Sequence, residues 1–390
     1  MAIDPQEFQH RLSKTRARMR EANLDALVVV DPANLHYLTG YNAWSFYTPQ
    51  ALFVDHVNEP TFFMRAMDAD GAHRTVEPGT CTVVGYPEAL VHRPDTHPLE
   101  WIAQQLREAG HGRSVRVGIE GDAHFFSVRA FQSLLRVLPE WTIVESHELV
   151  NWVRLVKSPA EIELMRKAGR VSSEVMRTAI DAINVGVQQN ELAAIIQAAQ
   201  ARGVDDITGD YPAIVPLIMA GPAVDTPHLT FSNARFNAEA VSLELVGVHQ
   251  RYHAPLARTV SLAPPSKELE RLAAVTAEGL DLVLTGTKPG MEVREAHALW
   301  QRHITANGFE KASRLGYSIG IGYPPDWGER TVSIRNDDTT VLEPGMCFHV
   351  IAGMWLETGC EISESIVVTD TGVEALTNAP RALIVKGASS

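Results

Sequence analysis

Residues 157–183, KSPAEIELMRKAGRVSSEVMRTAIDAI, separate two parts of the chain that differ in their patterns. Ser158 and Glu161 form the Ser-x-x-Glu pattern of a helical capping box, and Pro159 suits the first position of a helix. Apolar side chains then recur every three or four residues, which is the spacing of one helical face. The segment therefore predicts a long amphipathic helix, and we expect a domain boundary just before it.

The residues before this helix alternate between strand and helix patterns. An apolar run at Leu27–Val30 stops at the Asp31-Pro32 turn, and a second strand pattern at residues 115–122 is followed by a helical one. Such alternation is typical of a sheet covered by helices. We therefore predict an N-terminal α/β domain over residues 1–155.

The residues after the boundary combine further helices with several β-like stretches. Two helical patterns end at Gly203 and Gly308, where glycine suits a C-terminal cap. The β-like stretches lie at 240–262, 315–335, 346–356 and 361–369. We predict a C-terminal domain over residues 156–390 and an α+β fold class for the whole chain.

Composition excludes several classes of partner. The formal net charge of −13 over 390 residues argues against nucleic acid or an anionic membrane as the main partner. The three cysteines, Cys81, Cys347 and Cys360, show no CxxC spacing, so we expect reduced thiols. No apolar run approaches the length of a membrane span, and the N-terminus lacks the pattern of a signal peptide. We expect a cytoplasmic protein.

The hairpin pattern AVSLELVGVHQRYHAPLART, residues 240–259, carries an unexpected acid. Glu244 stands between two leucines, where the pattern requires an apolar residue. A lone buried carboxylate is costly unless it is paired, protonated or used. Glu244 is therefore either the partner of an arginine, such as Arg251 or Arg258, or a functional residue.

Several other motifs allow both a functional and a structural interpretation. His228 follows a proline and is either a hydrogen-bonded loop residue or a catalytic one. The segment GYSIGIGYPPDWGER, residues 316–330, is either a rigid turn or an aromatic wall for a flat or cationic ligand. In the final strand, 359–369, we expect Glu361 to face solvent, whereas Glu364 shares a face with isoleucines.

Taken in order, these pieces resemble the pita-bread superfamily of creatinase, prolidase, aminopeptidase P and methionine aminopeptidase. The resemblance spans nearly the whole chain and includes the helix at 157–183, Pro227-His228, the hairpin ending in Arg-Thr, LEPGM and the strand ending in IVVT. It implies a creatinase-like two-domain protein whose C-terminal pita-bread domain is catalytic.

The resemblance also shows where the chain departs from the peptidases, which hold two metal ions with five side chains. Those five ligand positions fall at Glu244, Pro255, Tyr317, Ile351 and Ser363. Proline and isoleucine have no side-chain ligand atom, and tyrosine and serine are poor substitutes. We therefore expect neither a metal nor another cofactor.

A more specific resemblance is to the members of this superfamily that hydrolyse cyclic amidines. It rests on GYNAWSFY, GDYPAIVP, PHLT, YHAPLART, GYSIGIGYPPDWGER and NAPRALIVK. It implies a homodimer that opens an amidine ring, with a deacetylase acting on the acetylated product. Glu244 would be the nucleophile or general base, and His228 the proton shuttle.

The same resemblance implies a set of substrate-binding residues. An aromatic wall would face the cation, and an aromatic loop of the first domain would close the partner subunit's pocket. Arg330 or Arg258 would hold the substrate carboxylate, and Glu364 would orient His228 or a ring N–H. The remaining binding residues expected here are Trp44, Phe46, Tyr47, Tyr317, Tyr323, Trp327 and His253.

Three alternatives to this interpretation stay open. A metal-free hydrolase of another amidine or guanidine compound would keep Glu244 and His228. The creatinase glutamates, however, fall at Ala257 and Ile351. A metallopeptidase is disfavoured by the altered ligand positions, and a non-catalytic binding protein on the same fold is the third alternative.

Overall fold

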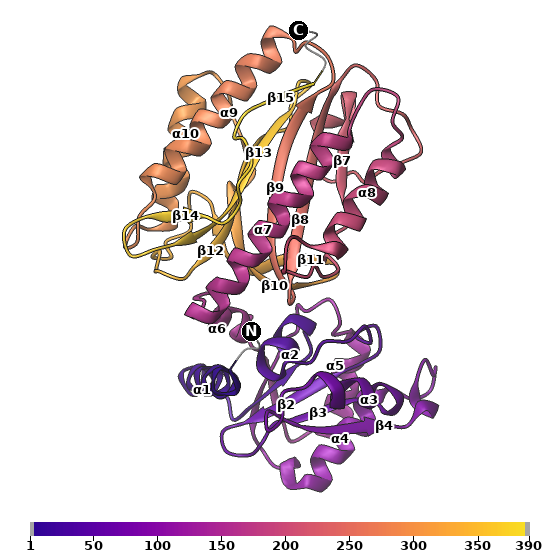
Figure 1. The fold of residues 1–390 in the computed structure, drawn as a ribbon. Coiled ribbons are helices and arrows are strands. Elements are labelled where there is room, and N and C mark those ends of the chain that lie inside the picture. The colour runs from indigo at the N-terminus through magenta and orange to yellow at the C-terminus, as the bar shows by residue number, and fades with distance from the viewer. Residues whose placement is uncertain (1–3, 387–390) are drawn as a thin grey trace. The chain divides into compact units, whose positions relative to one another are not determined.

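A computed structural model describes residues 4–386, which form two compact units that divide between Arg154 and Leu155. Each unit has its own sheet and its own helices (Figure 1). The predicted succession of an α/β part and a part with helices and antiparallel strands is confirmed.

The first unit is built on a six-stranded sheet in the order β4-β3-β2-β1-β5-β6. Its core joins strand residues to the inner faces of helices α4 and α5. The strands are β1 (Ala26–Val29), β2 (Ala51–Asp55), β3 (Thr61–Arg65), β4 (Thr82–Tyr86), β5 (Arg116–Ile119) and β6 (Thr142–Glu145). The helical segments are α1 (Pro5–Glu21), α2 (Pro32–Thr39), α3 (Ala66–Thr75), η1 (Glu88–Leu90), α4 (Pro98–Leu106), η2 (Arg107–His111), α5 (Val128–Val137) and α6 (Leu149–Arg154).

The second unit contains a nine-stranded sheet whose main path is β14-β13-β12-β10-β9-β8-β7. Strand β11 pairs with β10, and β15 pairs with β9. The strands are β7 (Leu217–Ala220), β8 (Ala240–His249), β9 (Tyr252–Ser261), β10 (Gly316–Tyr323), β11 (Asp326–Ile334), β12 (Cys347–Met354), β13 (Cys360–Val368), β14 (Val373–Ala375) and β15 (Ile384–Val385). The helical segments are α7 (Pro159–Ala182), α8 (Gln189–Arg202), η3 (Gly221–Asp225), α9 (Lys267–Gly286) and α10 (Val293–Ala306).

Helix α7 begins as its sequence predicts and packs closely on the β8–β9 hairpin. The Ser158 hydroxyl accepts from the Glu161 N–H at 3.3 Å, and the Glu161 carboxylate accepts from the Ser158 N–H at 3.0 Å. On the hairpin, Gly247 permits the close approach, because a Cβ there would lie 2.1 Å from the Ser172 backbone nitrogen. The glycine N–H instead donates to the Ser172 hydroxyl at 2.6 Å.

The two faces of the hairpin have different neighbours. Leu243 and Leu245 join an apolar cluster that includes Val171 and Val175 of α7. Successive strand residues point to opposite faces, so Glu244 points away from this helix. Both strands are nevertheless buried along nearly their whole length, so the second face of the hairpin is also covered.

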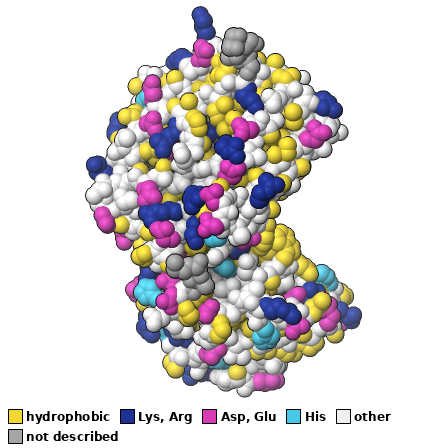
Figure 2. Space-filling model, viewed as in Figure 1, with side chains coloured by type: hydrophobic (Ala, Val, Ile, Leu, Met, Phe, Trp, Pro, Cys, Tyr) yellow, Lys and Arg dark blue, Asp and Glu magenta, His cyan; other side chains and the backbone are white. Residues whose placement is uncertain are grey.

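The visible surface carries charges of both signs (Figure 2), and the three cysteines lie inside the two units. Figure 2 shows acidic and basic side chains interspersed over the visible face. Between residues 4 and 386, we find no helix with the length and apolarity that a bilayer crossing requires. Cys81, Cys347 and Cys360 are free and buried, and burial raises the pKa of each thiol to about 12.

Candidate active site

Glu244 on β8 is enclosed, with only 4% of its surface exposed. Burial raises its pKa well above the ordinary glutamate value. The neighbouring carboxylate of Glu361 raises that pKa further, and the ammonium of Lys311 opposes the rise. Ionised Glu244 is therefore less stable here than it would be in water, because burial removes the hydration of its charge.

The two arginines suggested as partners of Glu244 bind elsewhere. Arg258, the β9 neighbour of Ala257, forms an ion pair with Glu364 of β13. Its guanidinium also donates to the carbonyls of Ser363 at 2.6 Å and Ala379 at 2.9 Å. Because Arg258 pairs across the strands with Leu243, this ion pair lies on the face opposite Glu244.

Glu364 consequently does not join Glu244. Besides Arg258, it accepts hydrogen bonds from Thr377 and from the Arg381 guanidinium at 3.2 Å. Its carboxylate is satisfied within the ion pair, on the helix-covered side of the sheet. The expectation that Glu364 orients His228 or a ring N–H is therefore not met by its position.

Three residues that the sequence interpretation missed surround Glu244 instead. They lie on a loop before β10, on β12 and on β13. We call Glu244 and these three the carboxylate cluster: Glu244, Lys311, His349 and Glu361.

Lys311 brings the positive charge into this cluster. Its ammonium donates to the Ile351 carbonyl at 2.8 Å and lies 4.6 Å from the centre of the Trp355 ring. Burial lowers the pKa of Lys311 to about 7, against the attraction of Glu361 and Glu244. The ammonium is thus held at β12 and interacts electrostatically with both carboxylates.

His349 is a neutral hydrogen-bonding residue at this site. One ring nitrogen, Nε2, lies 2.7 Å from the Ser363 hydroxyl. The other, Nδ1, lies 3.3 Å from the Tyr317 hydroxyl and 3.9 Å from Glu244 Oε1. Burial lowers the pKa of His349 to about 3, with Lys311 and Arg314 contributing, so the ring stays uncharged near neutral pH.

Tyr317 reaches the cluster, and Trp327 supports it. The Trp327 indole N–H donates to the Tyr317 hydroxyl at 2.7 Å, and Trp327 is only 1% exposed. Burial raises the pKa of Tyr317 well above its ordinary value, and Glu244 raises it further. Tyr317 therefore remains a neutral phenol beside Glu244, whereas Trp327 lies behind it.

Tyr323 and His253 take part in a different arrangement around Arg251. The Arg251 guanidinium lies 3.7 Å from the Tyr211 ring centre and 4.5 Å from that of Tyr323. Tyr323 thus faces a cation of the protein itself. His253 is fully buried; its Nδ1 lies 2.7 Å from the Arg251 carbonyl, and its Nε2 accepts from the Ala213 N–H at 3.0 Å.

His228 lies in the loop that precedes β8 and is exposed. The carbonyl of the next residue, Leu229, accepts from the Ile218 N–H at 3.0 Å, which holds this segment along β7. In β7, Leu217 is the cross-strand partner of Glu244. His228 is therefore near the hairpin, but none of the contacts described here joins it to Glu244.

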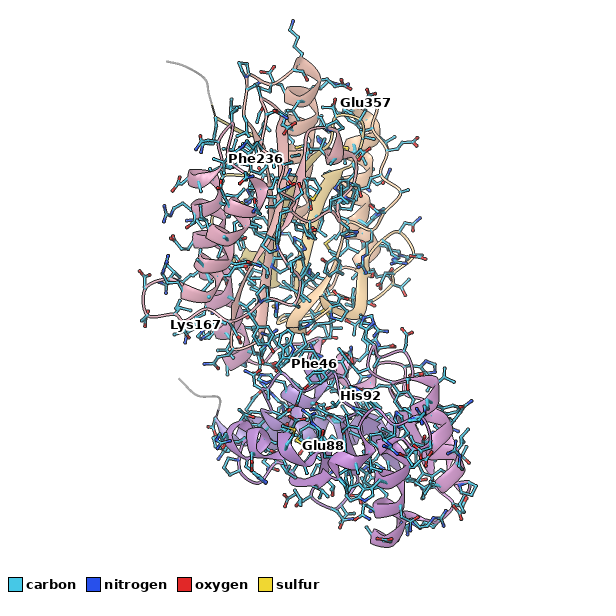
Figure 3. The ribbon with its side chains drawn as sticks, turned by 90° about the vertical axis from the view of Figure 1, so that its right-hand side faces the viewer. Phe46, Glu88, His92, Lys167, Phe236 and Glu357 are labelled. Atoms are coloured by element: carbon cyan, nitrogen blue, oxygen red, sulfur yellow. The ribbon has the colours of Figure 1, made fainter. Side chains whose placement is uncertain are left out.

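The remaining predicted residues lie on β11 and in the first unit. Arg330 is partly buried on β11. In the first unit, Trp44 and Tyr47 are more than half exposed, at 57% and 56%, whereas Phe46, labelled in Figure 3, is buried. Phe46 packs between Trp44 and Phe125, with ring centres 5.0 Å and 5.4 Å away.

The donor set does not fit the dinuclear metal site of the peptidases in this superfamily. Of the five corresponding positions, Glu244 is a carboxylate and Tyr317 a neutral phenol, whereas Pro255 and Ile351 have no ligand atom in their side chains. At the fifth, the Ser363 hydroxyl accepts from the Ala257 N–H at 2.7 Å and lies 2.7 Å from His349 Nε2. Within residues 4–386 there is no group of three or more His, Cys, Asp or Glu side chains arranged to hold a metal ion.

Comparisons with known proteins show what the chain is similar to. The chain is 40% identical to ectoine hydrolase of Halomonas elongata over 98% of each protein, and 42% identical to an uncharacterized hydrolase/peptidase of Sinorhizobium fredii over 97% of each. Among solved structures, prolidase from Thermococcus sibiricus covers 99% of this chain and 100% of its own, with a TM-score of 0.84 and 20% identity. That likeness confirms the predicted pita-bread architecture.

The family assignment covers both units. Residues 11–156 match the creatinase/prolidase N-terminal domain, and residues 163–370 match metallopeptidase family M24. The chain therefore belongs to metallopeptidase family M24 and carries a creatinase/prolidase N-terminal domain before its M24 domain.

Proposed function

We propose that this protein hydrolyses the cyclic amidine ectoine to N-acetyl-L-2,4-diaminobutyrate. The relative that is 40% identical over nearly the full chain is named ectoine hydrolase, which supports this substrate. The observation that carries the proposal is Glu244, a buried carboxylate without an arginine partner in a site whose donors do not suit two metal ions. An amidinium is a delocalised cation centred on the carbon that must be attacked, so it both neutralises and uses such a carboxylate.

Glu244 acts as the nucleophile in this proposal, or as the base that activates water. Overall, the oxygen of one water becomes the amide oxygen of the product. The released ring nitrogen leaves as an ammonium group, so the positive charge passes from the amidinium to the product amine. Tyr317 and His349 line the site as neutral groups, so neither forms an ion pair with the substrate cation or with Glu244.

A proton must reach the ring nitrogen as its bond to carbon breaks. His349 is a poor donor for this step, since burial lowers its pKa to about 3 and its ring carries no extra proton near neutral pH. We assign the step to His228, which is exposed to solvent and can exchange protons with it. Its loop would have to bring the ring toward β8 when substrate is bound.

The same proposal includes the assembly of the enzyme, the residue that binds the substrate carboxylate and the enzyme that acts next. We propose a cytoplasmic homodimer, in which the exposed Trp44 and Tyr47 of one subunit, supported from behind by the buried Phe46, close the pocket of the other and exclude water. Arg330 would hold the substrate carboxylate. The acetylated product requires a deacetylase as the next enzyme, and hydroxyectoine is the related substrate to compare.

Removing divalent metal ions is expected to leave ectoine turnover unchanged. Enzyme treated with a strong chelator and passed through a desalting column is incubated with ectoine, and ring opening is followed by proton NMR. Hydroxyectoine and a simple guanidine compound are run in parallel to define the substrate class. Loss of ectoine turnover on chelation, with recovery on adding metal, would contradict the metal-independent proposal.

The rate should fall as the pH is lowered, because Glu244 must be ionised to attack or to activate water. Its pKa is raised by burial and by Glu361, so protonation begins at a higher pH than for an ordinary glutamate. Below that pKa, kcat/KM for ectoine is expected to fall about tenfold per pH unit. A profile that stays flat down to the ordinary pKa range of an exposed glutamate would show that Glu244 does not limit the reaction.

A further inference from the structure

Glu361 is a buried carboxylate that lacks well-formed hydrogen bonds. It is 0% exposed, and neither of its oxygens accepts a hydrogen bond from the described residues. The buried Trp355 indole N–H also lies outside hydrogen-bond geometry. Burial raises the pKa of Glu361, but the Lys311 ammonium and this N–H are close enough to lower it. The two side chains are neighbours, because a Cβ added at Gly353 would lie 2.9 Å from the Trp355 ring and 3.2 Å from Glu361 Cγ.

Other glutamates of the same sheet show that this condition is not general. Glu364, three residues along the same strand, is equally buried and has Arg258, Arg381 and Thr377 as partners. Glu329 on β11 pairs with Lys157 at 2.6 Å. Buried polar groups are normally satisfied, so a carboxylate whose two oxygens lack well-formed hydrogen bonds calls for a ligand that supplies the missing donors.

Glu361 and Glu244 belong to one face of the sheet. Glu361 and Ser363 are two residues apart in β13, so their side chains lie on the same side of the sheet. The Ser363 hydroxyl accepts from the N–H of Ala257, which is the cross-strand partner of Glu244. The charge of Glu361 also raises the pKa of Glu244, so the two carboxylates are close enough to repel each other.

The chemistry of a planar N–C–N cation requires two carboxylate positions. A nucleophile must approach the central carbon from above or below the plane, where the empty π* orbital is accessible. The N–H bonds point outward within the plane, so the attacking carboxylate cannot also accept them in good geometry. A second carboxylate at the edge of the cation can do so, in the way that carboxylates bind arginine.

We propose that Glu361 is a second substrate-binding carboxylate, which accepts the in-plane N–H groups of the cation while Glu244 faces its carbon. Lys311 is the residue that positions Glu361, with its ammonium fixed by the Ile351 carbonyl at 2.8 Å and by the Trp355 ring at 4.6 Å. The ligand class is a planar amidinium or guanidinium; for ectoine itself the inference rests on the proposed function.

The charges of the carboxylate cluster match such a ligand. When Glu244, Glu361 and Lys311 are ionised, the two carboxylates and one ammonium leave a single net negative charge. His349 and Tyr317 add none, as both are neutral. One monovalent cation therefore balances the site, whereas a neutral ligand would leave the buried charge uncompensated.

The test uses a small acyclic amidinium as the probe, so that binding of the cation is measured apart from the opening of a ring. Acetamidinium, with neutral acetamide as its control, is titrated into the full-length protein by ligand-observed NMR. Glu361→Gln is expected to weaken acetamidinium binding about 10- to 100-fold, the cost of losing charge-assisted hydrogen bonds, and to leave acetamide unaffected. Glu310→Gln, an exposed glutamate beside Lys311, serves as the matched control and should bind as wild type does.

The second readout is the pH profile of ectoine turnover. Glu361→Gln removes a charge that raises the pKa of Glu244, so the acid limb should move to lower pH and KM should rise. Lys311→Met removes an opposing charge and should move the limb to higher pH. If Lys311→Met fails to fold, the double variant Lys311→Met/Glu361→Gln, which removes the charges as a pair, is expected to fold and to bind acetamidinium weakly.

The outcomes separate this inference from the proposed function. Unchanged acetamidinium binding in Glu361→Gln overturns the inference even if the wild type opens ectoine. Binding that depends on Glu361, in a protein that leaves ectoine intact, supports the inference and contradicts ectoine as the substrate. Equal binding of acetamide and acetamidinium by the wild type also overturns it, since the site would then not recognise charge.

Discussion

Glu244→Gln is expected to abolish ectoine turnover and to leave the protein at least as stable as the wild type. The amide is nearly the same size as the carboxylate but can neither attack carbon nor take a proton from water. Loss of such a group lowers kcat by about a thousandfold or more. The effect on stability should have the opposite sign, because the substitution removes a charge that is buried and repelled by Glu361.

The opposite signs are what distinguish a functional carboxylate from a structural one. A structural glutamate stabilises the fold, so its loss lowers the melting temperature; a catalytic one is kept at a cost in stability. Turnover by proton NMR and melting by circular dichroism give both values, with Glu310→Gln as the control. Turnover within tenfold of the wild type, or a clear drop in melting temperature, would contradict the role given to Glu244.

The same variant helps to separate the two routes of attack. If Glu244 bonds to the amidine carbon, acid-quenched wild type should carry a mass adduct of the substrate, which Glu244→Gln lacks. If Glu244 activates water, no adduct forms in either protein. Both routes require the carboxylate, so the loss of turnover does not depend on which one operates.

Arg258→Met is expected to destabilise the second unit strongly. The guanidinium is 0% exposed and serves Glu364 together with the carbonyls of Ser363, Ala379 and Pro380. Removing it leaves Glu364 as a buried charge that has lost its main partner. Breaking a buried ion pair on one side costs about 3–5 kcal/mol. For a unit of this size that corresponds to a fall in melting temperature of about 10 °C.

A surface arginine provides the comparison. Arg177 also forms ion pairs, with Glu174 and Asp181, but its side chain is 62% exposed. Arg177→Met should melt within error of the wild type, because solvent already screens those pairs. Adding Glu364→Gln to Arg258→Met should recover part of the loss. If Arg258→Met melts as the wild type does, the Arg258–Glu364 pair does not hold the sheet together.

Much of the architecture could be predicted from local sequence signals. Ser158, Pro159 and Glu161 marked the start of α7, and the unit boundary lies four residues before that cap residue. Glu244 was identified because a carboxylate interrupts an apolar strand. In both cases a few adjacent residues carry the physical cause, so no knowledge of tertiary packing was needed.

The rest of the site depends on contacts between distant segments. Lys311 stands in the polar sequence FEKASR, which has the composition of an exposed loop, yet its ammonium reaches the Ile351 carbonyl. Glu361 was expected to face solvent because its strand alternates. That prediction was wrong, since β13 is buried on both faces. Tyr323 was expected to face a ligand cation, and only the fold reveals that Arg251 occupies that position.

Alternate residues of β13 lie on opposite faces of the sheet, and the two faces have different roles. Glu361 and Ser363 face the carboxylate cluster, whereas Glu364 and its neighbour Ile362 secure the other side of the sheet. Substitutions at the first pair can therefore retune the ligand while the second pair keeps the scaffold intact. A combinatorial library at 361 and 363 should yield folded variants with altered cation selectivity. The same library at 362 and 364 should yield mainly insoluble chains. Such a separation makes the strand a place where new specificities can arise without a prior gain in stability.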